Sequence, residues 1–147
     1  MAKLTVDNGS PEQIVKDIKK LAHEKGFPCT FTADTAEFII KRIRDNSMML
    51  FGRYSDGILV SIGTLSIFSV FPCPDSPNGL VGHISGVYTH PQYRRRGHST
   101  KLLDEMTEAG RLYGCDYLCL DSTADELYCK AGFVRAPEGE TRMWKRL

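Results

Sequence analysis

The sequence lacks an excess of charge of either sign. Its 147 residues carry 19 lysines and arginines against 18 aspartates and glutamates, which gives a formal net charge of +1 when the histidines are neutral. Domains dedicated to nucleic acid or to a membrane surface normally have a basic excess over a whole face. The balance argues against both classes, so we expect no nucleic-acid partner and no membrane partner.

Metal-ligand spacing and long apolar runs are also missing. The cysteines match no zinc motif, and they are Cys29, Cys73, Cys115, Cys119 and Cys129. An odd number of cysteines without such spacing is typical of reduced thiols, so we expect a cytoplasmic protein without a metal. No apolar run is long enough to cross a membrane, and the first residues show no signal-peptide pattern.

The composition is that of an ordinary globular domain. Apolar residues make up 41% of the chain and charged residues 25%, which suits one hydrophobic core. We find no internal repeat, no low-complexity segment and no linker. The sequence therefore predicts a single domain over residues 1–147.

Two amphipathic helices are predicted near the start of the chain. The first begins at Ser10, which forms a capping box with Gln13, and ends at Gly26. The second covers residues 32–45. The expected cap pair of this second helix is Asp34 and Glu37, and its expected buried stripe is Phe38, Ile39 and Ile43.

The pattern then changes to that of strands. Three consecutive strands are predicted over residues 47–54, 57–70 and 80–89, joined by a turn at residues 55–57 and a proline-rich loop over residues 71–79. The later elements are a helix from Gly97 to Gly114 with an apolar face of Leu102, Leu103, Met106, Ala109 and Leu112, a strand over 116–121, a short helix over 126–132, and closing strands over 133–137 and 141–147. This order predicts a mixed α/β domain.

Three consecutive arginines, residues 94–96, precede the long helix. A strand, a turn with glycine and a helix together bind phosphate, because the first amides of a helix are unpaired and its dipole favours an anion. Gly97 allows close approach to the backbone, and Ser99 keeps a further position small. The stretch has too few glycines for a P-loop or a dinucleotide fingerprint. A solvated charge run and contact with nucleic acid remain alternatives.

Two segments resemble motifs of the GNAT superfamily of N-acetyltransferases. The segment VYTHPQYRRRGHSTKLL, residues 87–103, resembles the coenzyme A motif through Val87, Pro91, Arg94, Gly97 and Ser99, with Ser99 in place of the usual glycine or alanine. The segment STADELYCKAGF, residues 122–133, resembles a second motif through Ala124, Tyr128, Gly132 and Phe133. The resemblance covers residues 80–135 well and the N-terminal half only in element order.

The resemblance implies a fold and an activity. The GNAT fold is a central, mostly antiparallel mixed sheet of about six to seven strands flanked by four helices. The implied reaction moves the acetyl group of acetyl-CoA, the cosubstrate, to a primary amine of a small molecule by direct attack in a ternary complex. A peptide or protein amine as acceptor and a non-catalytic acyl-CoA sensor remain alternatives. The C-terminal strand is a possible homodimer edge.

The resemblance also implies site residues. The expected cofactor-binding residues are Val87, Tyr88, Thr89, Arg94, Arg95, Arg96, Gly97, His98, Ser99, Thr100 and Tyr128. Amides of residues 95–100 would hold the pyrophosphate, and backbone groups of Val87 and Thr89 the pantetheine arm. The Val87 amide would stabilise the oxyanion. Tyr128 would protonate the leaving thiolate, and the alternative for it is a core tyrosine.

His83 is the candidate general base. It lies 14 residues before Gly97, where some family members carry an acidic base, and a histidine titrates near neutral pH. A hydrogen-bonded strand histidine, with water as the base, is the alternative. The strand is expected to place His83, Ser85 and Val87 on one face and Ile84, Gly86 and Tyr88 on the other, with a bulge at Gly86.

Two further expectations concern the acceptor side. Asp121 stands where many relatives have an asparagine near the pantetheine, which leaves that hydrogen bond open; Ser122 as the substitute and a helix cap are the alternatives. The acceptor pocket is expected between the helix pair and the loop before the third strand, bordered by Phe27, Phe31, Phe68 and Phe71. These aromatic side chains, without an acidic cluster, favour an acceptor with one amine and an apolar body.

Overall fold

The structure is a computed structural model that describes residues 3–4, 10–122, 125–135 and 142–147. Its helices are α1 (Pro11–Leu21), α2 (Ala33–Arg44), α3 (His98–Leu112), α4 (Asp125–Lys130) and the short 3-10 helix η2 (Pro91–Tyr93). Its strands are β1 (Lys3–Leu4), β2 (Met49–Ser55), β3 (Ile58–Ser69), β4 (Leu80–Thr89), β5 (Tyr117–Asp121), β6 (Val134–Arg135) and β7 (Arg142–Arg146). Ala124 of the second motif lies outside the described residues.

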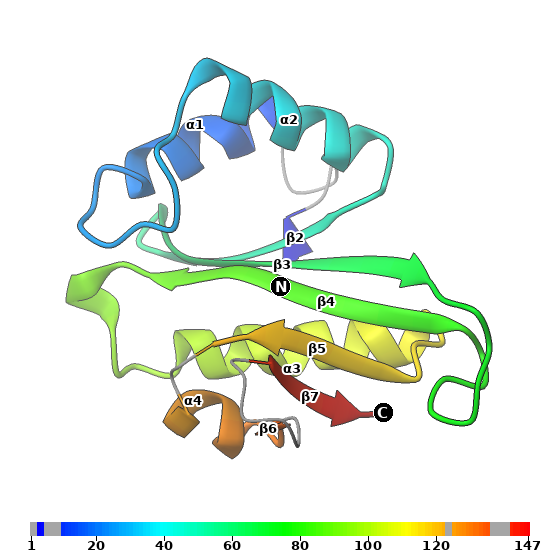
Figure 1. Ribbon diagram of the computed structural model, residues 1–147. Helices are drawn as coiled ribbons and strands as arrows, with labels where there is room; N and C mark the ends of the chain where they lie inside the picture. Colours follow the sequence, from blue (N-terminus) through cyan, green and yellow to red (C-terminus); the bar gives the residue numbers. More distant parts are fainter. Residues whose placement is uncertain (1–2, 5–9, 123–124, 136–141) are drawn as a thin grey trace.

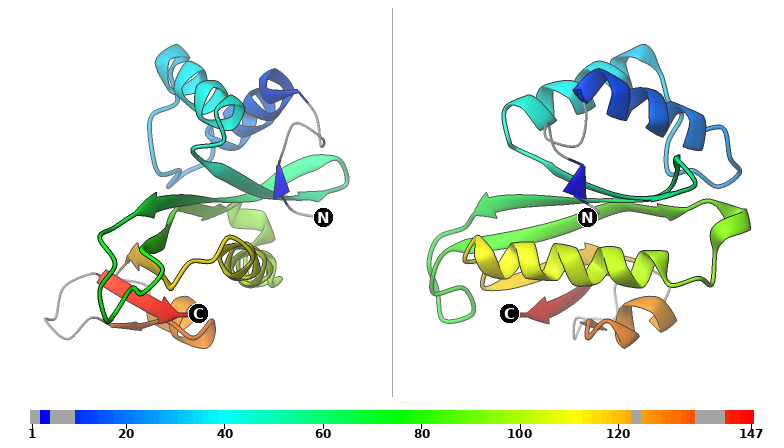
Figure 2. Two further views of the ribbon diagram at one scale, coloured as in Figure 1. Left: turned by 90° about the vertical axis from the view of Figure 1, so that its right-hand side faces the viewer. Right: turned by 180° about the vertical axis from the view of Figure 1, so that it is seen from behind.

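One mixed sheet organises these elements. The strand order is β1-β2-β3-β4-β5-β7-β6, and only the β4–β5 pair is parallel. Helices α1 and α2 lie on one face of the sheet, and α3 lies on the other (Figures 1 and 2). The predicted mixed α/β fold, with a mostly antiparallel sheet and four helices, is confirmed. Strand β1 was not expected, because two residues carry no readable alternation.

A hydrophobic core fills each side of the sheet. The core under α1 and α2 contains Ile14, Ile18, Leu21, Ile43, Leu50, Leu59, Ile62 and Tyr88. The core under α3 contains Phe51, Leu65, Ile84, Leu102, Leu103, Met106, Leu118, Leu120, Tyr128, Phe133 and Met143. Each fully buried aliphatic side chain contributes about 1.5–3 kcal/mol relative to an exposed one. The two cores hold the helices against the sheet and fix the ends of β4.

The first helix begins as predicted and ends earlier. The Ser10 side chain accepts a hydrogen bond from the Gln13 amide at 3.2 Å, which confirms Ser10 as the cap. The Gln13 side chain donates to Asp17 instead of closing the capping box. The helix ends at Leu21, and the residues up to Gly26 form turns.

Three expectations about helix surfaces are wrong. Thr32 and Thr35 cap α2 through reciprocal side-chain bonds, so Asp34 and Glu37 are not the cap pair. Phe38 is 54% exposed and lies against the guanidinium of Arg42, because the inward stripe of α2 runs through Ile39 and Ile43. Leu112 is exposed at the last turn of α3, because the buried face of that helix continues through Thr107 and Gly110.

Within the described residues, no helix combines the length and apolarity needed to span a membrane.

Candidate active site

Strands β4 and β5 pair at one end and separate at the other. Their parallel ladder joins residues 81–83 to residues 117–119 and goes no further, although β4 continues to Thr89. Figure 1 shows β4 running on toward the turn before α3. In the described part of the chain, no strand pairs with this edge of β4 beyond His83. The backbone groups along this edge are therefore available to an extended ligand, apart from the Thr89 carbonyl, which accepts a hydrogen bond from Arg94.

Gly86 forms the predicted bulge where the strands separate. Its φ is +63°. The β3–β4 register shifts there, so that Gly63 on β3 stands opposite both Gly86 and Val87 on β4. Val87 consequently packs toward the core under α3, whereas Tyr88 belongs to the core under α1 and α2. The expectation that Ile84, Gly86 and Tyr88 share one face is therefore wrong. The bulge reverses the alternation between Ile84 and Tyr88.

The turn before α3 leaves the helix N-terminus open. Arg95 has a φ of +61° and Gly97 a φ of +80°, so two left-handed residues precede the helix. Gly97 takes the cap position without any side-chain hydrogen bond to the first amides. Apart from its two chain neighbours, a Cβ atom at Gly97 would meet no atom of the described residues within 4 Å. Free amides facing open space at a helix N-terminus form an anion site.

A row of three hydroxyl groups ties this turn to the sheet. The Ser99 hydroxyl is 2.7 Å from that of Thr89, which is 2.8 Å from that of Ser61. Ser61 in turn donates to the carbonyl of Tyr88. Ser99 thus binds the end of β4, which accounts for a serine where the motif usually has glycine or alanine. Thr100 is exposed in the first turn of α3.

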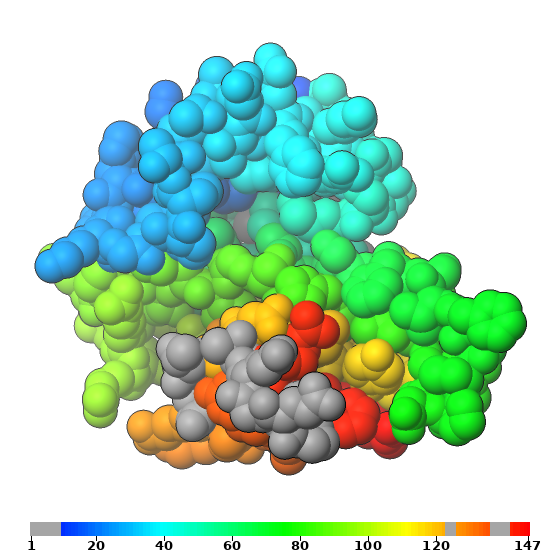
Figure 3. All heavy atoms as spheres, in the orientation of Figure 1, coloured from blue at the N-terminus to red at the C-terminus, as the bar shows by residue number. Residues whose placement is uncertain are grey.

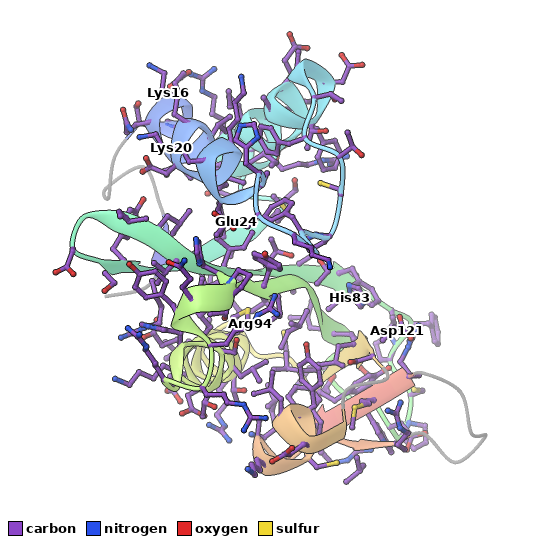
Figure 4. All side chains as sticks on the ribbon, turned by 90° about the vertical axis from the view of Figure 1, so that its left-hand side faces the viewer. Lys16, Lys20, Glu24, His83, Arg94 and Asp121 are labelled. Carbon is purple, nitrogen blue, oxygen red and sulfur yellow. The ribbon has the colours of Figure 1, made fainter. Side chains whose placement is uncertain are left out.

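The three arginines point to different places. Arg94 donates from Nε to the Thr89 carbonyl at 3.0 Å, and its guanidinium lies 5.5 Å from the ring centre of Tyr88. Arg96 lies over the ring of Tyr93 at 5.1 Å. Arg95 is close enough to α4 to help Lys130 lower the pKa of Glu126. Figure 4 labels Arg94 beside the turn. The three guanidinium groups therefore have different neighbours, although all three residues are exposed.

The His98 side chain is engaged within the protein. Burial lowers its pKa, and the nearby charges of Arg53, Lys101 and Arg96 lower it further. Its Nδ1 accepts a hydrogen bond from Nε of Arg53 at 3.4 Å. The imidazole is therefore neutral at pH 7 and directed at β2, which leaves the His98 backbone amide for a ligand.

Tyr128 projects from α4 into the core under α3. Its side chain is 9% exposed, and its ring meets Phe133 edge-on with 6.2 Å between ring centres. Burial raises the pKa of Tyr128. Among the described residues, no group forms a hydrogen bond with its hydroxyl. The phenol thus stays protonated at neutral pH and has a proton to give.

His83 lies beside Asp121 where the two strands separate. Its Nε2 is 3.8 Å from Oδ2 of Asp121, and Oδ1 of Asp121 accepts a hydrogen bond from Nε of Arg142 at 3.0 Å. Figure 4 shows His83 and Asp121 side by side. The hydrogen bond to Asp121 raises the pKa of Arg142. Sequence reasoning missed Arg142, because only the β5–β7 register brings it opposite Asp121.

The connection between α1 and α2 packs against the end of β4 and encloses a pocket of about 340 Å³. The Tyr88 hydroxyl donates to the Lys25 carbonyl at 2.7 Å, and Nε2 of His90 lies 3.0 Å from Oε1 of Glu24. Figure 3 shows the surface hollowed between the α1–α2 layer and the strands below it. The pocket lining includes Phe27 and Phe31, as expected.

The loop before β4 does not border that pocket, which corrects the expectation for Phe68 and Phe71. Phe71 is 91% exposed. The loop is held at the opposite end of β4 by the buried Asp116, which accepts hydrogen bonds from the Ser76 hydroxyl at 2.7 Å and from the Asn78 side chain at 2.8 Å. These bonds close the loop onto the start of β5, away from the separated strands.

Comparisons with known proteins agree with this architecture. The model of the acetyltransferase (GNAT) family matches residues 14–133. The search of curated proteins finds no significant match. Many solved structures share the fold.

Three of these structures illustrate the likeness. A predicted acetyltransferase from Clostridium acetobutylicum, solved with acetyl-CoA, is 17% identical, with a TM-score of 0.74 over 92% of this chain and 90% of its own. A Trypanosoma brucei acetyltransferase is 25% identical, with a TM-score of 0.69 over 88% and 91%. Glucosamine-6-phosphate N-acetyltransferase from Arabidopsis thaliana is 17% identical, with a TM-score of 0.67 over 91% and 90%.

Proposed function

Because the chain belongs to the GNAT acetyltransferase family, we propose that it moves the acetyl group of acetyl-CoA to a primary amine of a small molecule. The chain is an acetyltransferase that depends on acetyl-CoA. The observation that carries the finer proposal is the unpaired edge of β4 next to the open N-terminus of α3. An extended arm with a charged pyrophosphate suits an edge that ends at an anion site.

The donor would lie along β4 and end at the turn before α3. Backbone groups of residues 87–89 would pair with the pantetheine arm, and the free amides of residues 95–100 would bind the pyrophosphate. All three arginines would add positive charge near the pyrophosphate, because Arg94 and Arg96 contact neutral groups, the Thr89 carbonyl and the Tyr93 ring, and Arg95 lies near Glu126. The hydroxyl row from Ser99 to Ser61 keeps the two binding segments in register.

Three groups would carry the chemistry. His83 would accept a proton from the acceptor ammonium, so that a neutral amine attacks the thioester carbonyl. The Val87 amide would stabilise the oxyanion that forms on attack. Tyr128 would protonate the departing thiolate: burial raises its pKa, so the phenol is protonated at neutral pH, and its hydroxyl has no hydrogen-bond partner among the described residues. The amine attacks directly in a ternary complex, and no covalent enzyme intermediate is needed.

The acceptor would be a small molecule with one amine and an apolar body. Phe27 and Phe31 line the pocket formed by the α1–α2 connection. Glu24 lines the same pocket and is already paired with His90. An acceptor with several positive charges would need unpaired carboxylates there. The Arabidopsis protein of the same fold acts on glucosamine 6-phosphate, a small-molecule amine.

A thermal-shift titration with acetyl-CoA, with single-stranded RNA in parallel, tests the proposal. A ligand at 100 times its Kd adds about 2.7 kcal/mol to the free energy of unfolding, which raises the Tm of a domain of this size by roughly 5–10 °C. A shift with acetyl-CoA alone leads to a panel of amines with detection of the released thiol. Thiol release with small amines supports the proposal. A flat acetyl-CoA curve, or binding without turnover of any amine, overturns it.

A further inference from the structure

Side chains of three neighbouring strands form a row of ion pairs on the face of the sheet opposite α3. His83 on β4 stands opposite Cys119 on β5, and Asp121 stands opposite Arg142 on β7. Side chains two residues apart on a strand share a face, so Asp121 lies on the same face as Cys119. The side chains of His83 and Asp121 are 35% and 48% exposed, so both are accessible from solvent. The row lies where β4 and β5 separate.

We propose that Asp121 is a positioning residue for His83, and that Arg142 holds the Asp121 carboxylate in place. The inference rests on the proposed function, in which His83 accepts the proton of the acceptor ammonium. The Nε2 and Oδ2 atoms, 3.8 Å apart, are within ion-pair distance but beyond a hydrogen bond. The Asp121 carboxylate therefore attracts the His83 ring most strongly once the imidazole is protonated. It also favours the proton on Nε2, which leaves Nδ1 as the basic atom.

The first proton transfer of the reaction leaves one positive charge in this row. Nδ1 of His83 takes the first proton from the ammonium, and the positive imidazolium forms next to the Asp121 carboxylate. The amine lone pair then attacks the thioester carbon, and the carbon–sulfur bond breaks. Tyr128 gives its proton to the sulfur, and the second proton of the amine restores the phenol as the amide forms. The row thus stabilises the positive charge that the first transfer creates.

The other groups around His83 do not supply this charge. Its ladder partners are Cys119 on β5 and Ser66 on β3. Burial raises the pKa of Cys119, so its thiol is neutral at pH 7, and Ser66 has no charge. Arg142 is positive and is bound to Asp121 through the other carboxylate oxygen. Of the strand residues that the structure describes around His83, Asp121 is therefore the one whose negative charge stabilises a positive imidazolium.

An NMR titration of the histidine signals tests the pair without any substrate. The full chain has four histidines, and His83→Gln identifies the signal of His83 by its loss. We expect the His83 signal of Asp121→Asn to titrate at lower pH than in the parent, because the substitution removes the negative charge 3.8 Å from Nε2. Arg142→Gln should not lower it, since it removes a positive charge.

A matched control lies at the other end of β7. Arg146 forms a 3.8 Å ion pair with the exposed Asp75, so Asp75→Asn removes a comparable charge far from His83 and should leave the titration unchanged. An Asp121→Asn curve that superimposes on the parent curve overturns the proposal. An Arg142→Gln variant that lowers the midpoint as far as Asp121→Asn also overturns it, because loss of local structure would then explain both. The Tm of each variant identifies unfolding.

The pH dependence of kcat/KM links the pair to the reaction. In Asp121→Asn the acidic limb of the profile should move in the same direction as the NMR titration, with the Kd of acetyl-CoA unchanged. His83→Gln should lose that limb. If no amine is acetylated, the proposed function fails while the NMR titration still decides whether Asp121 acts on His83. If amines are acetylated and His83→Gln keeps the parent limb, the proposed function stands and the role of the pair in catalysis is refuted.

Discussion

Replacing Tyr128 with phenylalanine removes one hydroxyl group and leaves the aromatic ring in place. The ring packs edge-on against Phe133 within the core under α3, and the hydroxyl has no hydrogen-bond partner among the described residues. The Tm should therefore stay within about 2 °C of the parent value, since no buried bond is broken. Loss of a general acid should lower kcat by about 10²–10⁴-fold, and a hundredfold loss corresponds to about 2.7 kcal/mol of barrier.

Steady-state kinetics with thiol detection measures this loss. Acetyl-CoA binding, measured separately by calorimetry, should be unchanged, so the effect falls on kcat. Burial raises the pKa of Tyr128 above its usual 10.0, so ionisation of this phenol should cause no fall in parent activity below pH 10. Tyr113→Phe, at an exposed tyrosine after α3, is the matched control. A Tyr128→Phe enzyme with kcat within about threefold of the parent would refute the acid role.

Three further predictions concern the turn before α3 and the loop before β4. Gly97→Ala should lower the free energy of unfolding by about 1–2 kcal/mol, because the φ of this residue is +80°. It should also weaken acetyl-CoA binding measured by calorimetry, and unchanged affinity would contradict the anion site. Ser99→Ala should lose one hydrogen bond to Thr89 and lower the free energy of unfolding, measured in urea, by about 0.5–1.5 kcal/mol. Burial alone would raise the pKa of Asp116, but hydrogen bonds from Ser76, Asn78 and Leu80 lower it overall. The stability from this carboxylate is therefore present above about pH 4 and lost as the pH falls through the lower folded value, so the difference in urea midpoint between parent and Asp116→Asn should shrink on acidification; a constant difference would contradict it.

The order of helices and strands was predictable because each long element carries its own period. Apolar residues at helical spacing mark α1 and α3, and alternation marks β2, β3 and β4. The glycine-containing turn before α3 and the bulge at Gly86 were also readable, since both depend on residues close in sequence. Strand β1 has only two residues and exists through its pairing with β2. No local pattern announces it.

The arrangement of the site was only partly predictable. The sequence shows three consecutive arginines but not where each side chain lies: Arg94 contacts Thr89 and Arg96 lies over Tyr93 through contacts that the turn creates. His83 became a candidate through its distance to Gly97, and its role stays a prediction, whereas its contact with Asp121 depends on the parallel β4–β5 register. Arg142 depends in addition on the β5–β7 register. Register between distant strands is set by tertiary packing, which a single sequence does not display.

Amide chemical shifts during an acetyl-CoA titration show where acetyl-CoA binds. The proposed function places this donor along the free edge of β4 and at the open N-terminus of α3. With uniformly ¹⁵N-labelled protein, the largest changes should fall on the amides of residues 87–89 and 95–100, while amides of the loop over residues 71–79 stay constant. Saturable changes confined to the α1–α2 connection, or no saturable change at all, would contradict the account.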